Sequence, residues 1–494
     1  MRSLRGKFVV FGLAIMFLAG FILYNPQKSL ALSWEQMGTS GLGGGAGNST
    51  AVRMVNFNNK LYVSIGNYNL PPTGVEIFSS TDGQTWTQVN SDGFGTAANL
   101  DAVMTVYNST LYAGTVVLGG MTQLWKTTNG TDWTQVGQDG FGDFGNSRIV
   151  GMSEFNGKLY LGVGNPITGA EVFSLDSAGT LTQVNTDGFD GTNTNDFIWS
   201  MQEYNGALYA GTGASAGGAQ LWKTTNGTTW SAVMQGGFGD VNNDTITTLF
   251  SFNGKLYAGT INATTGTEIW RTTTSDTSWE QANTDGFGDP HTIWSGDQAA
   301  IVNGTIYIGT RSSNIDGAKL FTSTNGSTWT MEGTAGFGDP ANNFAMYAIT
   351  FNGRIYLGIS SATGAEIWRT GSMSTLSITS TSLDEGTVGS SYSDSVDKNT
   401  AGTTPFVWSL VSGSLPDGLT FNFSAGTISG TPTKAGTYTF TVSVTDAGNP
   451  TQLASQELSI KINAIAATAT ATATSVILPE TGGNWYLGWV NSLF

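Results

Sequence analysis

The 494-residue sequence contains no cysteine and only one histidine, His291. The first absence excludes disulfides, thiolate metal ligands and cysteine nucleophiles, and the second excludes metal sites built from several histidines. Basic residues are also scarce, because 19 Lys and Arg face 35 Asp and Glu and leave a formal net charge of −16. Since phosphate backbones attract clustered basic side chains, no nucleic acid partner is expected.

Helical apolar periodicity is absent as well. The sequence has 68 glycines and is otherwise dominated by Thr, Ser, Asn and aromatic residues. These residues are typical of β-strands and tight turns. The composition therefore predicts an all-β protein.

The N-terminus has the pattern of an export signal. Arg2, Arg5 and Lys7 precede an uncharged apolar run over residues 8–24, and Ser29 and Ala31 then supply small residues at the spacing of a cleavage site. We expect residues 1–31 to be a signal peptide or an N-terminal membrane anchor. Either reading predicts an extracellular, cell-surface location.

A repeated unit fills most of the chain. It reads F-N-G-K-L-Y-x-G-T, E-I-W-R-T-T, N-G-x-x-W-T-Q-V and D-G-F-G-D, and the spacing between successive anchor tyrosines is 48 to 50 residues. This period suits one four-stranded blade per repeat. The anchor tyrosines are Tyr62, Tyr112, Tyr160, Tyr209, Tyr257, Tyr307 and Tyr356. The sequence thus predicts a seven-bladed β-propeller over residues 32–371.

The strands within a unit follow from its turns, since Asn-Gly between apolar runs favours a two-residue hairpin. In the third unit we expect strands at residues 149–155, 158–163, 170–175 and 180–184. The repeated tryptophans and the methionines Met54, Met104, Met152 and Met201 hold fixed places in their units. A residue that recurs once per blade usually packs one blade against the next, so we assign both sets to packing.

The seventh unit lacks its own outer strand, and the missing strand lies at the other end of the chain. Residues 33–36 match residues 278–281 exactly in type, as Ser-Trp-Glu-Gln. A ring must join its first and last blades, and an N-terminal strand in the last blade would pair an open edge. We therefore predict that residues 33–38 close the propeller.

A different pattern begins near Leu376. The runs L-P-D-G-L-T-F at 415–421, G-T-I-S-G-T-P-T at 426–433 and G-T-Y-T-F-T-V-S-V-T-D at 436–446 closely resemble the immunoglobulin-like, cadherin-like modules of bacterial surface proteins. The resemblance implies a β-sandwich over residues 374–464 that acts as a spacer or an adhesive unit.

The tail is an Ala/Thr-rich linker at residues 465–477, followed by residues 478–494. Leu478, Pro479, Glu480, Thr481 and Gly482 resemble a sortase signal, which implies covalent attachment to the cell wall. That family's pattern also requires a membrane-spanning stretch and a basic end, whereas residues 483–494 contain no Lys or Arg. A truncated sequence and a fortuitous match both stay open.

The D-G-x-x-W turns, such as Asp82 to Trp86, resemble the Asp-box turns of sialidase-type propellers, although they are one residue shorter. Such turns are structural in that family. Its chemistry would need an arginine cluster for a substrate carboxylate and a tyrosine nucleophile with a carboxylate base. Arg53, Arg148, Arg311 and Tyr347 form a partial set, and a sialidase-like hydrolase would require the three arginines to converge at the central channel.

The D-G-F-G-D loops should share one face with the connections between second and third strands, and long loops are where propellers usually carry function. Paired aspartates on these loops offer the oxygen ligands of calcium sites, although Asp also serves turns without metal. The pairs are Asp139 with Asp143, Asp187 with Asp190, and Asp285 with Asp289. Phe141, Phe189, Phe238, Phe287 and Phe337 either contact a ligand or pack over the blade edge.

No nucleophile, acid-base pair or metal cluster stands out from the repeats. We therefore predict a non-enzymatic, adhesin-like protein without a cofactor, calcium excepted, that binds an extracellular glycan or protein through the loop face. The predicted ligand-binding residues are the five phenylalanines with Arg53, Arg148 and Arg311. The alternatives are a sialidase-like hydrolase and a purely structural surface-layer protein.

Overall fold

The computed structural model describes residues 32–68, 70–214, 216–313, 316–371, 376–399, 401, 405–446 and 452–465. The chain divides into two compact units, residues 1–301 with 305–373 and residues 302–304 with 374–494. Within the described ranges, no helix is long and apolar enough to cross a membrane. The expected signal or anchor at residues 1–31 and the sortase-like motif lie outside the described residues.

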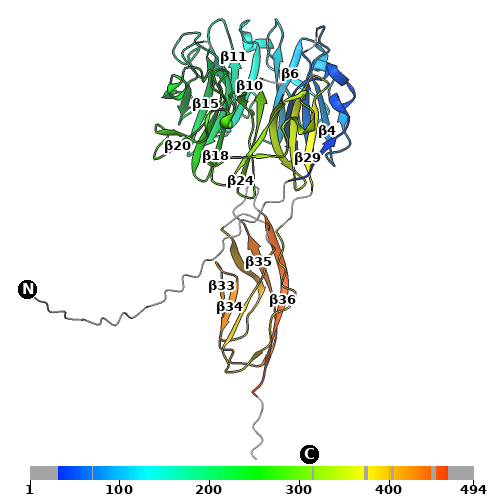
Figure 1. Cartoon of the computed structure of the whole chain (residues 1–494), viewed down its shortest axis with the longest axis vertical. Coiled ribbons are helices and arrows are strands. Elements are labelled where there is room, and N and C mark those ends of the chain that lie inside the picture. The colour runs from blue at the N-terminus through cyan, green and yellow to red at the C-terminus, as the bar shows by residue number, and fades with distance from the viewer. Residues whose placement is uncertain are drawn as a thin grey trace, which may run out of the picture. The chain divides into compact units, whose positions relative to one another are not determined.

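The first unit is a seven-bladed propeller, which confirms the predicted fold class (Figure 1). Blades 1 to 3 consist of β2–β5 (Thr50–Phe57, Lys60–Gly66, Glu76–Ser80, Thr87–Gln88), β6–β9 (Asn99–Tyr107, Thr110–Val117, Leu124–Thr127, Thr134–Val136) and β10–β13 (Arg148–Phe155, Lys158–Gly164, Glu171–Leu175, Leu181–Gln183). Blades 4 and 5 consist of β14–β17 (Asn195–Tyr204, Ala207–Ala214, Leu221–Thr224, Ser231–Met234) and β18–β21 (Thr245–Phe252, Lys255–Ile261, Ile269–Thr272, Trp279–Gln281).

Blade 6 differs from the others because its inner strand is broken. It consists of β22 (Thr292–Ser295), β23 (Ala300–Val302), β24 (Thr305–Ser312), β25 (Leu320–Ser323) and β26 (Thr330–Glu332). Blade 7 consists of β27 (Asn342–Phe351), β28 (Arg354–Ser361), β29 (Glu366–Thr370) and β1 (Trp34–Met37). Residues 296–299 therefore leave the regular path of an inner strand at one place in the ring.

The hairpins follow the predicted turn chemistry. In blade 3, Asn156 and Gly157 have φ of 48° and 70°, as a two-residue type I′ turn requires. The four strands of this blade lie where the sequence predicts them, with small differences at their ends.

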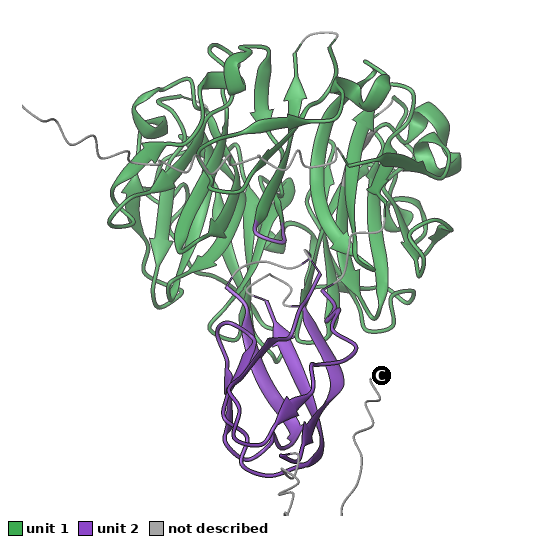
Figure 2. Cartoon of the chain, turned by 60° about the horizontal axis from the view of Figure 1, so that its bottom comes forward, with its two compact units in different colours: residues 1–301, 305–373 green, residues 302–304, 374–494 purple. Residues whose placement is uncertain are grey.

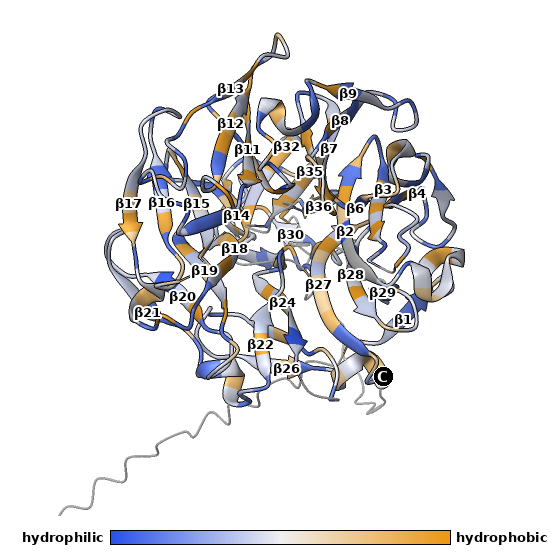
Figure 3. Cartoon of the chain, turned by 90° about the horizontal axis from the view of Figure 1, so that it is seen from above, coloured by the Kyte–Doolittle hydropathy of each residue, from blue (hydrophilic) through white to orange (hydrophobic). Residues whose placement is uncertain are grey.

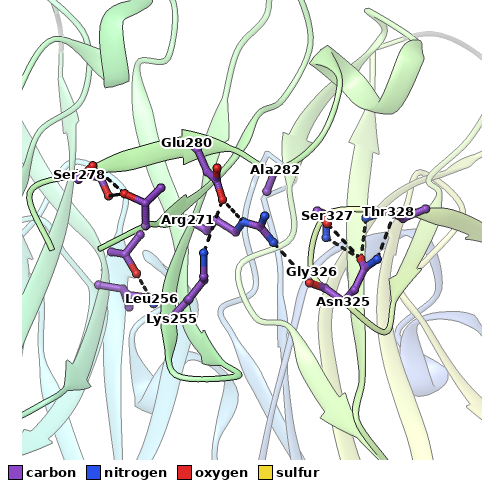
Figure 4. Close-up of polar contacts among 12 residues, drawn as sticks. Lys255, Leu256, Arg271, Ser278, Glu280, Ala282, Asn325, Gly326, Ser327 and Thr328 are labelled. Carbon is purple, nitrogen blue, oxygen red and sulfur yellow. Dashed lines mark hydrogen bonds and ion pairs between the residues drawn. The ribbon is translucent and has the colours of Figure 1, made fainter. Parts of the chain in front are cut away.

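The N-terminal strand closes the ring as predicted. Strand β1 pairs antiparallel with β29, with Glu35 opposite Arg369, and the Arg369 Nε lies 2.7 Å from the Glu35 Oε1. Figure 4 shows the counterpart inside blade 5, where the Arg271 Nε lies 2.7 Å from the Glu280 Oε1. The closing strand thus reproduces the contact that an ordinary outer strand makes within its own blade.

Repeated side chains join neighbouring blades. The indole Nε1 of Trp133, Trp230 and Trp329 donates to a backbone carbonyl of the preceding blade, at Val89, Val184 and Ala282 respectively, over 2.8 to 3.1 Å. The glycine of three Asn-Gly turns and of the Asp82-Gly83 turn also lies against the anchor tyrosine of the preceding blade in the ring. These tryptophans are therefore packing residues, in agreement with the sequence interpretation, and the anchor tyrosines pack between blades as well.

The second unit is an Ig-like β-sandwich (purple in Figure 2). One sheet has the order β30-β36-β35-β32 and the other the order β31-β34-β33. The strands are β30 (Gly386–Thr387), β31 (Tyr392–Ser395), β32 (Val407–Gly413), β33 (Leu419–Asn422), β34 (Thr427–Gly430), β35 (Gly436–Thr445) and β36 (Leu453–Asn463). Trp408, Ile428, Phe440 and Ile460 are buried between the sheets.

Candidate functional site

A cavity of about 360 Å³ opens where the inner strands begin, around the axis of the propeller. Figure 3 shows inner strands β2, β6, β14, β18 and β27 arranged around this axis. Side chains of five blades line the cavity, namely Arg53, Tyr68, Asp101, Trp199, Trp294, Arg311 and Phe344. All of these residues lie outside the repeated motif.

Arg53 lines this cavity and is only 3% exposed. Its Nε lies 3.4 Å from the Asp101 Oδ2, and its Nη2 lies 3.2 Å from the Asp297 Oδ2. Its Nη1 donates to the Tyr347 hydroxyl over 3.2 Å. Trp199 donates its Nε1–H to the Asp297 Oδ1 over 3.0 Å. The guanidinium is therefore fully engaged by two buried carboxylates and a tyrosine.

Burial changes the proton affinity of these groups. It raises the pKa of Asp297 to about 6, with Arg53 opposing the rise, and it also raises the pKa of Asp101. One guanidinium shared by two buried carboxylates cannot fully compensate both negative charges. Burial likewise raises the pKa of the Tyr347 hydroxyl above its ordinary value.

The break in blade 6 is what brings Asp297 to the axis. Gly296 N donates to the Gly309 carbonyl at the end of β22, and a Cβ at Gly296 would lie within 3.0 Å of three backbone oxygens. Gln298 then pairs with Tyr347 of blade 7 in an isolated parallel bridge. The glycine thus permits a close backbone approach that turns the inner strand toward the centre.

A second cavity of about 270 Å³ is lined by Asp297 and Tyr347 and shares Trp199 with the first. Its other walls come from residues further along the inner strands, among them Val55 and Gln202. Arg53 and Arg311 belong to the first cavity. Arg53 and its partners therefore lie between two cavities of the central channel.

Three arginines lie over aromatic rings near the first cavity. The guanidinium carbon lies 5.6 Å from the Tyr347 ring centroid for Arg53, 5.3 Å from that of Phe197 for Arg148, and 5.4 Å from that of Trp294 for Arg311. Trp199 makes edge contacts with Phe197 and Trp294, with centroids 5.5 and 5.3 Å apart. The aromatic rings therefore form one continuous cluster.

The structure brings the three predicted arginines close together, but they differ in their contact with the cavity and in their ion pairs. Arg53 and Arg311 line the same cavity, whereas Arg148 reaches it through the Phe197–Trp199 contact. Within the described part of the chain, every arginine forms an ion pair except Arg148 and Arg311. Of these two side chains, Arg311 lines the cavity and is therefore the unpaired arginine that a ligand there would meet.

The five predicted phenylalanines lie between blades. Phe189 and Phe238 stack on Trp222 and Trp270 of the next blade at 4.9 and 5.0 Å. Phe287, Phe141 and Phe337 contact Phe321, Phe173 and Trp368. The structure does not bring these rings together with the arginines, and a ligand-binding role for them stays a prediction.

The predicted calcium ligands bind protein groups. Asp139, Asp187 and Asp285 each accept a hydrogen bond from an outer-strand glutamine, and Asp143, Asp190 and Asp289 each accept one from a backbone N–H two residues onward. Among the residues that the structure describes, no three His, Asp or Glu side chains form a metal-ligating group. Calcium at these loops stays a prediction.

Sequence reasoning missed Tyr68, Asp101, Trp199, Trp294 and Asp297. These residues could have been found as departures from the repeat, because each differs from the residues at the equivalent position of most other units. Asp297 in particular follows the Gly296 that breaks the inner strand of blade 6.

The comparisons with known proteins agree with the two folds. The family model of the DUF6242 beta propeller domain matches residues 29–237, and that of the He_PIG Ig domain matches residues 373–477. No match was found among curated proteins.

Solved structures resemble the chain only distantly. The extracellular domain of a hybrid two-component system of B. thetaiotaomicron shares 15% identity with a TM-score of 0.49, over 86% of this chain and 47% of that one. The polysaccharide lyase Uly1 shares 14% with a TM-score of 0.42, over 66% of this chain and 90% of that one. An ancestral GH74 enzyme shares 12% with a TM-score of 0.46, over 66% and 49%. The chain spans about half the length of the two-component system's domain.

Proposed function

We propose that the protein is a non-enzymatic, cell-surface binding protein that holds a glycan with an anionic group in the cavity around Arg53. The observation that carries this proposal is the state of Arg148 and Arg311. They are the arginines without an ion pair in the described part of the chain, both lie over aromatic rings, and Arg311 lines the cavity itself. A cation held in this way can bind a carboxylate or sulfate without first losing an intramolecular partner.

The rest of the cavity suits a sugar. Trp199, Trp294 and Tyr68 present aromatic surface on which the apolar face of a pyranose ring can lie. The cavity volume of about 360 Å³ is within the range of small-ligand sites and could hold one or two sugar units. Aromatic walls with a few charged groups are the usual composition of a ligand pocket.

Hydrolysis is the second candidate, and the Arg53–Tyr347 contact with two nearby carboxylates favours it. Two observations support binding instead. Arg53 is neutralised by Asp101 and Asp297, and Tyr347 lines the second cavity rather than the one that contains Arg311. A tyrosine nucleophile would have to meet the substrate in the same cavity as the arginines.

The test is a glycan array with acidic and neutral glycans, probed with the purified protein in calcium and again in chelator. We expect selective binding to glycans that carry a carboxylate or sulfate, at least tenfold weaker in Arg311→Ala and unchanged in Arg354→Ala. Arg354 is a matched control because it pairs with Glu35 in blade 7. Equal binding of neutral glycans, or release of sugar products that Tyr347→Phe abolishes, would contradict the proposal.

Attachment to the cell surface is part of this proposal. Export by residues 1–31 and wall attachment through Leu478 to Gly482 would hold the propeller outside the cell, with the Ig-like unit as a spacer. Cell fractionation tests it, because replacing Thr481 should move the protein from the wall fraction to the medium. A chelator-sensitive array signal that is lost when Asp139, Asp187 and Asp285 are replaced by Asn would support calcium at these loops.

A further inference from the structure

The exposed apolar side chains of the propeller are concentrated on one face. Among the described residues of this unit, seven large apolar side chains are strongly exposed, and six of them lie on loops that leave a second strand or lead into an inner strand. These six are Tyr68, Leu70, Leu118, Phe144, Ile167 and Val241, with exposed fractions from 43% to 81%. The seventh, Met331, is on outer strand β26.

The six residues, here named the apolar crescent, all belong to blades 1 to 4 or to the loops that follow them. The repeat places different residues at the same positions elsewhere in the ring. Pro290 and Pro340 stand where Phe144 and Val241 stand, and Thr264 stands where Ile167 stands. The crescent is therefore a property of one half of the loop face and not of the blade architecture.

The charge on these loops is also one-sided. The eight loops on this side, residues 67–75, 89–98, 118–123, 137–147, 165–170, 184–194, 215–220 and 235–244, contain seven aspartates and no Lys, Arg or His. Asp139 and Asp187 accept hydrogen bonds from outer-strand glutamines, which places them toward the rim and away from the arginines of the axis. These loops therefore combine exposed apolar side chains with carboxylates and contain no basic residue. Such a surface is complementary to a partner that carries apolar and positively charged side chains.

We infer that the apolar crescent binds a basic, amphipathic segment of a partner protein. The apolar tips would be covered by the apolar side of that segment, and its Lys and Arg side chains would face the exposed carboxylates of these loops, such as Asp92 and Asp190. Anionic lipid surfaces would be repelled by the same carboxylates. This inference does not depend on the cavity, because the crescent loops other than the one with Tyr68 do not line it.

The probe is a designed 14-residue helical peptide of Leu and Lys, titrated against the purified protein by fluorescence anisotropy. We expect saturable binding that weakens as salt rises and that falls at least tenfold in the variant Leu70→Ser, Phe144→Ser, Ile167→Ser, Val241→Ser. Met331→Ser is the matched control, since Met331 is exposed outside the crescent, and Arg311→Ala should leave peptide binding unchanged.

Three results would overturn the inference. The first is equal affinity for an all-Lys peptide, which would indicate charge attraction alone. The second is unchanged peptide affinity in the fourfold variant with a native circular dichroism spectrum. The third is stronger binding of the protein to lipid vesicles than to the peptide. Failure of the glycan array with success of the peptide titration would reject the proposed function and leave this surface supported.

Discussion

Gly130 lies in the Asn-Gly turn of blade 2, against the anchor tyrosine of blade 1. A Cβ built on it would lie 1.8 Å from the Tyr62 hydroxyl, and its φ is +85°. Tyr62 is 1% exposed and cannot move aside without disturbing the packing between the blades. We expect Gly130→Ala to lower the free energy of unfolding by about 3 kcal/mol, as measured by urea denaturation.

Gly157 supplies the matched control for this substitution. It has a similar φ of +70°, but no atom lies within 4 Å of the position of its Cβ. Gly157→Ala should therefore lower the free energy of unfolding by only about 1 kcal/mol, which is the cost of holding an alanine in the left-handed backbone conformation. Adding Tyr62→Phe to Gly130→Ala should recover part of the loss, and equal costs for the two glycines would contradict the steric explanation.

Asp297 should make stability depend on pH. Its pKa is about 6 in the folded protein because of burial, whereas an unfolded aspartate titrates near 4. The folded state therefore binds the Asp297 proton more tightly than the unfolded state does. The stabilisation that this proton gives to the folded protein is present below about pH 4 and is lost as pH rises through about 6. The loss is about 3 kcal/mol.

Thermal melts from pH 3.5 to 7.5 measure this effect. Asp297→Asn cannot ionise, so its melting temperature should fall less than that of the wild type between pH 4 and pH 6. Asp92→Asn serves as the control, because Asp92 is an exposed carboxylate in the loop after β5. Parallel pH profiles for wild type and Asp297→Asn would show that the buried carboxylate does not titrate in this window.

At the scale of elements, the strands, hairpins and closure could be predicted because each depends on local or repeated residues. Asn156 with Gly157 specifies a turn by itself, and the match between residues 33–36 and 278–281 identifies β1 as an outer strand. The break between β22 and β23 could not be predicted in the same way. It depends on Gly296 meeting backbone oxygens of another blade, and such contacts leave no local pattern.

Strand β1 is expected to hold the whole ring together. Its pairing with β29 is accompanied by Met37, which is 7% exposed and packs with Met54 and Ile367, and by an edge contact between Trp34 and Phe337 at 5.6 Å. Deleting Trp34–Met37 would leave the edge of β29 unpaired and open the ring between blades 7 and 1. We expect the melting temperature of the propeller to fall by about 10 °C or more, in a single transition.

A synthetic peptide of residues 32–44 provides the control for this deletion. Added in trans, it should pair with β29 and restore most of the lost melting temperature in proportion to its concentration. Loss of hydrogen-exchange protection confined to β29, with the other blades unchanged, would contradict a role in closing the whole ring.

At the scale of the molecule, the candidate site shows why fold and function differ in predictability. Arg53, Asp101, Trp199, Asp297 and Tyr347 come from blades 1, 2, 4, 6 and 7, and the ring brings them together from positions up to 294 residues apart. A repeat reveals what every blade shares, and that is packing. The cavity is lined by residues that differ from blade to blade. In the sequence they appear only as unrelated departures from the repeat, and their common place at the axis becomes visible only in the closed ring.

Each unit also has a core of its own, which predicts how the whole chain unfolds. Trp408 is 5% exposed and packs with Phe440, Ile428 and Ile460 inside the Ig-like unit, while the buried clusters of the propeller contain only propeller residues. Calorimetry of the full chain should therefore show two transitions. Trp408→Ala should destabilise the Ig-like unit by about 3 to 5 kcal/mol and lower one transition only. A single transition that shifts as a whole in this variant would mean that the two cores unfold cooperatively.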